Sequence, residues 1–138
     1  MNSPIIIFAP FPPSTNTLYP ASGGRRHLSK KAAKYKTDVQ WQLKRRYSLL
    51  QLVTKENHLF CILDLYPPDK RRRDVDNYSK LLIDSFTGLV FEDDSQIKKL
   101  LISWREVEAP GSVIITFGKL EQFDDYLRIA KSTEEVPF

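Results

Sequence analysis

The fold of this chain is decided by residues 59–88, which read LFCILDLYPPDKRRRDVDNYSKLLIDSFTG. The first eight of these residues form an apolar run that predicts a buried strand, and Pro67-Pro68 ends it because proline cannot donate to a sheet. Asp74 stands where a helix N-cap is expected, and apolar residues then recur every three or four positions up to Gly88. The stretch therefore predicts a strand, a basic loop and a helix, in that order.

On the N-terminal side, the sequence predicts one more strand and one more helix. Ile5 to Ala9 is β-branched and apolar, and the proline-rich segment after it cannot continue a regular element. Ser29 is a suitable N-cap for a helix that we expect to run to about Gln51. The apolar face of this helix is expected to consist of Ala32, Tyr35, Val39, Leu43 and Tyr47.

On the C-terminal side, the extended segments Ile97–Val107 and Val113–Gly118 flank the turn Ala109-Pro110-Gly111, and we expect a C-terminal β-hairpin. The predicted fold class is α/β (α+β), with a small mixed β-sheet, the order β-α-β-α-β-β and two main helices packed on the sheet. Residues 1–119 form the single predicted domain. The acidic tail, residues 120–138, is expected to be a short helix that ends in disorder.

Composition and length restrict the classes of protein to which this chain can belong. The 138 residues, 41% of them hydrophobic, suffice for one core and are too few for two ordinary domains. The single cysteine, Cys61, excludes a disulfide within one chain and a cysteine-based zinc site. No run approaches the roughly 18 apolar residues of a membrane span, and Met1–Pro13 lacks the basic start of a signal peptide. We therefore expect a soluble, cytoplasmic protein with no membrane partner.

The net charge of +4 is spread unevenly along the chain. Residues 1–63 carry ten lysines and arginines against two acids, whereas residues 69–94 hold seven acids next to the basic run Lys70-Arg71-Arg72-Arg73. Residues 120–138 are acidic, with five acids against two bases. An acidic cluster within a basic protein is the feature that a functional interpretation must explain.

The acids of residues 74–94 are of the kind that binds Mg²⁺. Hydrolysis of a phosphodiester needs an activated water and a neutralised leaving oxygen, and Mg²⁺ held by carboxylates supplies both. Asp74 and Asp76 lie at a strand-to-helix junction, and the next loop, Glu92-Asp93-Asp94, offers a third carboxylate. If both loops lie at one edge of the sheet, the carboxylates converge. Each loop also has a simpler interpretation, because Asp74 suits a helix N-cap and the later acids suit a solvated turn.

One face of the second predicted helix carries Asp76, Lys80 and Asp84 at four-residue intervals. Such a face is more often a solvated stripe of ion pairs than an active site. The basic run directly before Asp74 favours a function, because it supplies phosphate-binding groups next to the carboxylates. Lys80 would then stabilise negative charge on a phosphate, and Asp84 would hold Lys80 in place.

The central block resembles the signature of RusA-type Holliday junction resolvases. The block comprises residues 67–77, PPDKRRRDVDN, followed by Lys80, Asp84 and residues 92–97, EDDSQI. The opening Pro12-Pro13-Ser14-Thr15-Asn16 also resembles the N-terminal loop of that family. The resemblance spans roughly residues 5–118, and its central block is long and unusual and therefore specific.

The resemblance implies a homodimeric endonuclease, bacterial or phage-encoded, that acts in DNA recombination and repair. It would bind branched DNA, the four-way junction, and nick two strands symmetrically with Mg²⁺ or with Mn²⁺ in its place. By position, Asp74, Asp76 and Asp94 match the catalytic, metal-binding carboxylates of the family, and Lys80 matches a functionally important lysine. Asp93 adjoins Asp94, and the register favours Asp94 as the closer ligand.

Nine residues are expected to contact DNA and to make its binding weaken with salt. They are Lys70, Arg71, Arg72, Arg73, Asn16, Arg25, Arg26, Lys30 and Lys34. We expect Trp41 and Trp104 to pack in a core or an interface rather than to stack on bases. Two alternatives remain open. One is a branched-DNA-binding protein without catalysis, and the other is a nucleotide phosphohydrolase, for which no glycine-rich phosphate loop is present.

Overall fold

A computed structural model describes residues 3–14, 29–46 and 52–134, without the side chains of residues 129–134. In chain order its elements are β1 (Ile5–Pro10), α1 (Lys30–Arg46), β2 (Leu59–Tyr66), η2 (Val75–Asn77), α2 (Ser79–Phe86), η3 (Asp94–Gln96), β3 (Ile97–Trp104), β4 (Ser112–Lys119), η4 (Leu120–Gln122) and α3 (Phe123–Glu134). The predicted fold class and the predicted order of its strands and main helices are confirmed.

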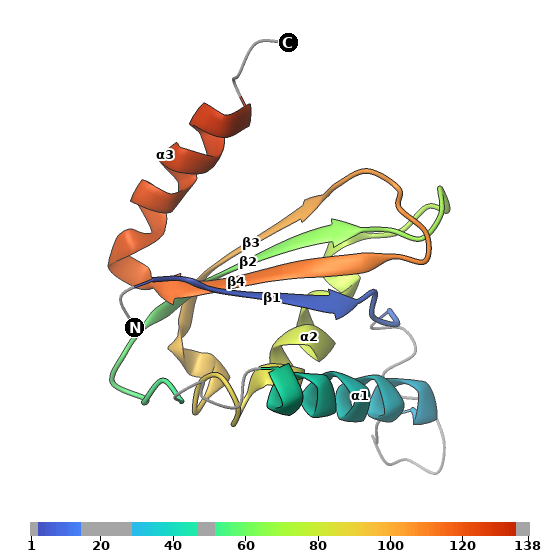
Figure 1. Cartoon of the computed structure of the whole chain (residues 1–138), viewed down its shortest axis with the longest axis horizontal. Helices are drawn as coiled ribbons and strands as arrows, with labels where there is room; N and C mark the ends of the chain where they lie inside the picture. The colour runs from blue at the N-terminus through green and yellow to red at the C-terminus, as the bar shows by residue number, and fades with distance from the viewer. Residues whose placement is uncertain (1–2, 15–28, 47–51, 135–138) are drawn as a thin grey trace.

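The strands form one mixed, four-stranded sheet in the order β1-β4-β2-β3 (Figure 1). β4 runs antiparallel to both β1 and β2, and β2 runs parallel to β3. β3 and β4 therefore run in opposite directions and are joined by the expected turn. They are not hydrogen-bonded to each other as in a tight hairpin, because β2 lies between them.

The place of each strand in the sheet follows from its burial. All eight residues of β2 are buried or half-buried, as expected for a strand with neighbours on both sides and apolar contacts on both faces. β3 is largely exposed and carries two lysines, which suits an edge strand that must not pair with another chain. The apolar sequence of β2 thus suits a central position in the sheet, and there β2 lies between β3 and β4.

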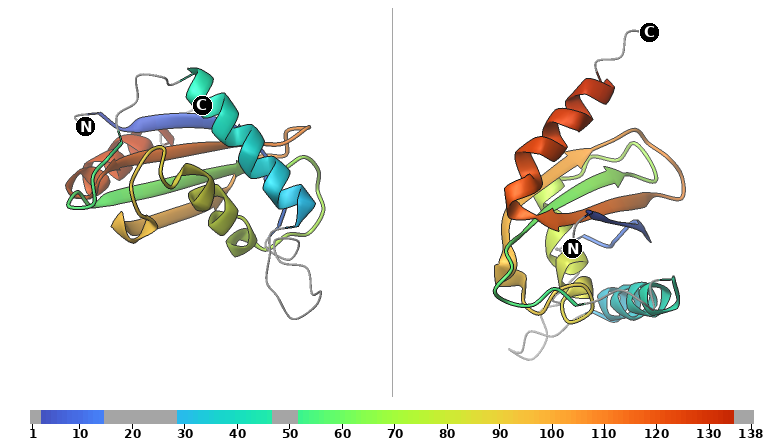
Figure 2. Two further views of the ribbon diagram at one scale, coloured as in Figure 1. Left: turned by 90° about the horizontal axis from the view of Figure 1, so that it is seen from below. Right: turned by 60° about the vertical axis from the view of Figure 1, so that its left-hand side comes forward.

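Helices α1 and α2 cover one face of the sheet (Figures 1 and 2). The hydrophobic core lies between them and the strands. Four of the five residues predicted for the apolar face of α1 are buried in it: Ala32, Tyr35, Val39 and Leu43. The N-cap prediction for α1 is confirmed, since the backbone N–H of Ala32 donates to Ser29 Oγ at 3.1 Å. Tyr47 and the expected helix end near Gln51 lie outside the described residues.

The helix predicted from Asp74 onward is divided into the short η2 and the longer α2. Asp74 occupies the N-cap position of η2 with extended backbone, but its side chain makes no capping hydrogen bond. Tyr78, between the two helical pieces, is buried against Phe11 and Trp104. The predicted helix stop is confirmed by Gly88, whose φ of 84° favours glycine.

The acidic tail does contain a helix, α3, and its first turn lies against the sheet. The ring centroid of Phe60, in β2, is 5.4 Å from that of Phe123 and 5.8 Å from that of Tyr126. α3 then leads away from the sheet (Figure 2). Residues 135–138, where disorder is expected, lie outside the described part. Within the described ranges, no helix has the length and hydrophobicity to cross a membrane.

Candidate active site

Asp74 and Asp76 form an exposed acidic pair at the start of η2. Val75, between them, packs against the core, and this contact leaves both aspartates in solvent. Within the described ranges, neither carboxylate takes part in a hydrogen bond or an ion pair. The simple interpretation of Asp74 as a capping residue therefore lacks its capping contact, and both carboxylates are available to a ligand.

Asp93 and Asp94 differ in what surrounds them. The Asp93 carboxylate accepts hydrogen bonds from the hydroxyl and the backbone N–H of Ser95, and these lower the pKa of Asp93. Asp93 therefore caps η3. Asp94 is exposed, and its carboxylate has no hydrogen bond or ion pair among the described residues. The surroundings favour Asp94 over Asp93 as a metal ligand, in line with the register.

The two acidic loops do not meet within one chain. Tyr78, next to the Asp74–Asp76 segment, contacts Trp104 at the end of β3, whereas Asp94 precedes the start of β3. A strand of this length spans roughly 23 Å. In Figure 1 the loop after β2 lies at the right, and the chain enters β3 at the left. Accordingly, the described residues contain no group of three side chains placed to hold a metal ion.

The condition under which the carboxylates would converge within one chain, that both acidic loops lie at one edge of the sheet, is therefore not met. The reason is topological. β3 runs parallel to β2, so the connection through α2 must return the chain to the end of the sheet at which β2 began. The loop after β2 and the loop before β3 then necessarily lie at opposite ends.

Lys80 lies on α2, one turn beyond Asp76, and remains exposed. Its Nζ is 3.6 Å from Asp84 Oδ2, so the pairing expected between Lys80 and Asp84 is confirmed. Among the described residues, no ion pair joins Lys80 to Asp76. Because an exposed ion pair of this kind is weak, Lys80 can exchange Asp84 for a phosphate at little cost.

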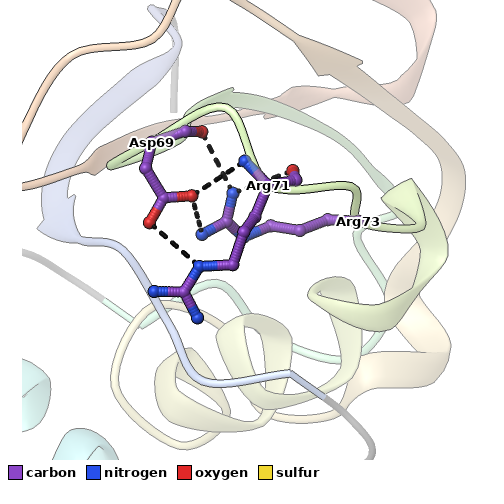
Figure 3. Close-up of polar contacts among 3 residues, drawn as sticks. All are labelled: Asp69, Arg71 and Arg73. Atoms are coloured by element: carbon purple, nitrogen blue, oxygen red, sulfur yellow. Dashed lines mark hydrogen bonds and ion pairs between the residues drawn. The ribbon is translucent and has the colours of Figure 1, made fainter.

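The basic loop before Asp74 is closed around Asp69 (Figure 3). Asp69 Oδ1 accepts from the backbone N–H of Arg71 at 3.0 Å and from Arg73 Nη2 at 2.7 Å. Arg73 Nη1 also donates to the carbonyl oxygens of Asp69 and Arg71. The N–H of Arg71 and then the Arg73 guanidinium lower the pKa of Asp69. These contacts give the loop a defined shape.

The Arg73 side chain makes its hydrogen bonds within this loop and is largely shielded from solvent. Its side chain is only 14% exposed, and its guanidinium carbon lies 5.7 Å from the centroid of the Phe11 ring. The sequence predicts a DNA contact for Arg73, and in the structure its guanidinium is held within the loop by these bonds and helps to fix the shape of the loop. Lys70, Arg71 and Arg72 are exposed, as phosphate contacts must be.

The other predicted DNA contacts are placed in part. Lys30 and Lys34 are exposed on α1, and Lys34 Nζ lies 3.0 Å from Asp38 Oδ2. Asn16, Arg25 and Arg26 lie outside the described residues.

Gln96 is a buried residue of the central block for which the sequence predicts no separate role. Its Nε2 donates to the carbonyl oxygens of Val53, Thr54 and Asn57, and its Oε1 accepts from the backbone N–H of Asp93 at 2.9 Å. These bonds fix the loop that carries Asp94. The spacing of Asp93 and Gln96 is that of a capping box, and this signal was present in the sequence.

Comparison with known proteins agrees with the resemblance of the central block. Residues 10–116 match the family described as endodeoxyribonuclease RusA. The crossover junction endodeoxyribonuclease RusA of Enterobacteria phage HK97 is 39% identical over 103 residues, which cover 74% of this chain and 82% of the phage protein. Proteins of the same name from Shigella sonnei and Escherichia coli K12 are 31% identical over 116 residues, which cover 83% of this chain and 88% of each relative. The chain thus belongs to the RusA family of endodeoxyribonucleases.

Proposed function

We propose that this protein is a structure-specific DNA endonuclease that resolves four-way junctions by paired, symmetrical nicks in DNA recombination and repair. Its relatives are named crossover junction endodeoxyribonucleases. The observation that carries the proposal is the exposed pair Asp74 and Asp76, which follows directly on a basic loop of defined shape. A nuclease needs metal-binding carboxylates beside phosphate-binding cations, and this segment supplies both.

The proposed cofactor is Mg²⁺, or Mn²⁺ in its place, and Asp74 and Asp76 would hold it. The donor set fits, because Mg²⁺ prefers oxygen ligands and is often bound by one or two carboxylates together with substrate phosphates. Both carboxylates are exposed and make no hydrogen bond within the described part of the chain. When bound, the ion would supply a water of lowered pKa and positive charge beside the phosphate.

The chain's own side chains have distinct proposed roles. Lys70, Arg71 and Arg72 hold the DNA backbone next to the acidic pair, and Lys30 and Lys34 extend this contact over α1. Lys80 contacts the phosphate under attack and stabilises its developing negative charge. Because these contacts are ionic, the affinity for DNA falls as the salt concentration rises.

A homodimer would allow the separated acidic loops to meet. In a two-fold interface, one segment of each copy can face a different segment of the other, and the contact occurs twice. We place Asp94 of one copy beside Asp74 and Asp76 of its partner as the third carboxylate. Such a dimer has two equivalent sites, which suit the two related strands of a junction.

The test uses a synthetic four-way junction, a linear duplex of matched sequence, and Mg²⁺ or EDTA. Wild type should nick the junction symmetrically only with the metal, and Asp74→Asn should bind the junction without cutting it. Asp125→Asn is a matched control, since it neutralises an exposed aspartate of α3. If wild type binds the junction but does not cut it in the presence of any divalent metal, the protein is a branched-DNA-binding protein without catalysis.

A further inference from the structure

A cleft of about 390 Å³ lies beside the basic loop. Its volume is within the range of small-molecule sites, about 300–1,000 Å³. The cleft is lined by Pro67, Asp69, Lys70, Arg71, Arg72, Arg73, Trp104 and Val107. Four of these side chains are cationic and one is a carboxylate, so the cleft is suited to an anionic ligand.

Two of the cations have no charge partner of their own. Asp69, the carboxylate of the cleft, is engaged by Arg71 and Arg73. Lys70 and Arg72 are exposed and form no ion pair among the described residues. These two side chains therefore remain to bind phosphate groups.

The cleft also presents an aromatic surface. Trp104 is 36% exposed, although the sequence predicts only packing for it. Phe11 stacks on the indole with ring centroids 6.2 Å apart and an interplanar angle of 19°. The Tyr78 ring meets the indole in a T-shaped contact, with ring centroids 5.7 Å apart and an interplanar angle of 73°. These two rings hold the indole in one orientation. The part that they leave uncovered borders the cleft together with Val107, which is itself exposed.

We propose that the Trp104 cleft binds an unpaired nucleotide of the DNA substrate, with the base stacked on the indole and the phosphates against Lys70 and Arg72. An exposed indole beside cations is the combination with which proteins bind single-stranded nucleic acid. In a duplex the faces of the bases are covered by their neighbours, so a base must leave the stack to reach the indole. The inference rests on the proposed function, in which DNA is the substrate.

The cleft adjoins the segment that carries the acidic pair, Asp74 and Asp76. Arg73 lines the cleft and directly precedes Asp74. A strand held by one unpaired nucleotide at Trp104 is thereby placed next to the acidic pair. Recognition of an unpaired nucleotide also discriminates branched or distorted DNA from an intact duplex, without any contact to a base edge.

The two tryptophans of the chain allow a direct test. Trp41→Phe leaves Trp104 as the only indole, and Trp104→Phe leaves Trp41, which is 62% exposed on α1, as the matched control. Each variant is titrated in EDTA with a single-stranded oligothymidylate and with the corresponding duplex. We expect the single strand to quench Trp104 emission at least twofold more than the duplex does, and to leave Trp41 emission nearly unchanged.

A second variant avoids any loss of core packing at Trp104. Lys70→Gln combined with Arg72→Gln should weaken binding of the single strand and lower the slope of log affinity against log salt by up to about two. Equal quenching of Trp104 by single strand and duplex overturns the proposal. So does binding detected by anisotropy of a labelled oligonucleotide without quenching of Trp104, or an absence of single-strand binding.

A parallel assay separates this inference from the proposed function. The Trp41→Phe variant is incubated with the four-way junction and Mg²⁺. Symmetrical nicking without preferential quenching of Trp104 rejects the cleft and retains the resolvase. Preferential quenching without nicking under any divalent metal retains the nucleotide site and rejects the resolvase.

Discussion

Asp93 and Asp94 are adjacent and chemically identical, yet their surroundings assign them different tasks. We expect Asp94→Ala to abolish junction cleavage without lowering Tm, because its carboxylate makes no hydrogen bond among the described residues. Asp93→Ala should retain cleavage and lower Tm by roughly 2–4 °C, because η3 loses its cap. Nicking assays and thermal melts of both variants measure this. Loss of cleavage in Asp93→Ala alone would reverse the assignment.

Substitutions of Arg72 and Arg73 should affect different properties, namely DNA binding for Arg72 and the stability of the fold for Arg73. Arg73→Gln removes a half-buried guanidinium and its bonds to Asp69, so we expect a loss of about 1–2 kcal/mol in the free energy of unfolding. Arg72→Gln should leave stability unchanged and lower the salt slope of DNA binding by about one. Urea unfolding and binding at several salt concentrations distinguish the two. A normal unfolding curve for Arg73→Gln would contradict its structural role.

At the scale of the element, the loop after β2 depends on an ionised Asp69. Its pKa is below the ordinary value of 3.8, so ionisation stabilises the fold above that pH, and the contribution disappears as pH falls through the lowered pKa. Asp69→Asn should therefore be less stable than wild type at pH 7, and the difference should close as the pH falls through the lowered pKa of Asp69. Thermal melts from pH 2 to 7 test this. A difference that is constant with pH would exclude a role for the charge.

Gly118 in β4 lies against Phe60 of β2, which itself packs on α3. A Cβ at this position would lie 2.4 Å from Phe60 Cε2, and Phe60 is fully buried beneath Phe123 and Tyr126. Gly118→Ala must push the Phe60 ring against α3, so we expect a loss of about 1–3 kcal/mol. Urea unfolding measures the loss, and amide exchange should show faster opening of α3. Gly88→Ala is a useful comparison, because it has open space but a positive φ.

Most elements could be predicted because their patterns are local. The apolar run predicts β2, and apolar residues that recur every three or four positions predict α1. Ser29 is an N-cap both in the sequence pattern and in the structure. The interrupted helix after Asp74 could not be predicted in the same way. Its break lies at Tyr78, whose ring is buried against Phe11 and Trp104, and these contacts join residues far apart in the chain.

Candidate site residues could be proposed from the sequence, but their arrangement in space could not be predicted. Motif spacing identifies Asp74, Asp76 and Lys80, but it does not say which neighbours a side chain takes up. The burial of Arg73 follows from Phe11, and the availability of Asp94 follows from the cap that Asp93 makes. Both depend on contacts that hydrophobic periodicity does not contain.

At the scale of the whole molecule, one topological fact governs the proposed chemistry. Because β2 and β3 are parallel, the chain must cross the sheet between Asp76 and Asp94, and the two acidic loops lie at opposite ends. A single copy therefore cannot bring these carboxylates together without losing β2 or β3 from the sheet. Either Asp94 acts in another copy of the chain, or it takes no part in the metal site.

Mixed dimers distinguish these two possibilities. If each site combines Asp74 and Asp76 of one copy with Asp94 of the other, then a dimer of Asp74→Asn with Asp94→Asn contains one site with both substitutions and one intact site. We expect such dimers, purified through two different tags, to nick one strand of a junction, although either variant alone is inactive. At random mixing about a quarter of the wild-type sites should be restored.

The control is a mixed dimer of Asp74→Asn with Asp76→Asn. Both substitutions affect the same acidic pair, so every site in that dimer is damaged and no nicking should return. If the mixture with Asp94→Asn stays equally inactive, although mixed dimers are recovered, then Asp94 does not act across the interface. Since the sheet also keeps it away from the acidic pair of its own chain, Asp94 would then lie outside the metal site, and Asp74 and Asp76 would have to hold the ion with the substrate phosphate alone.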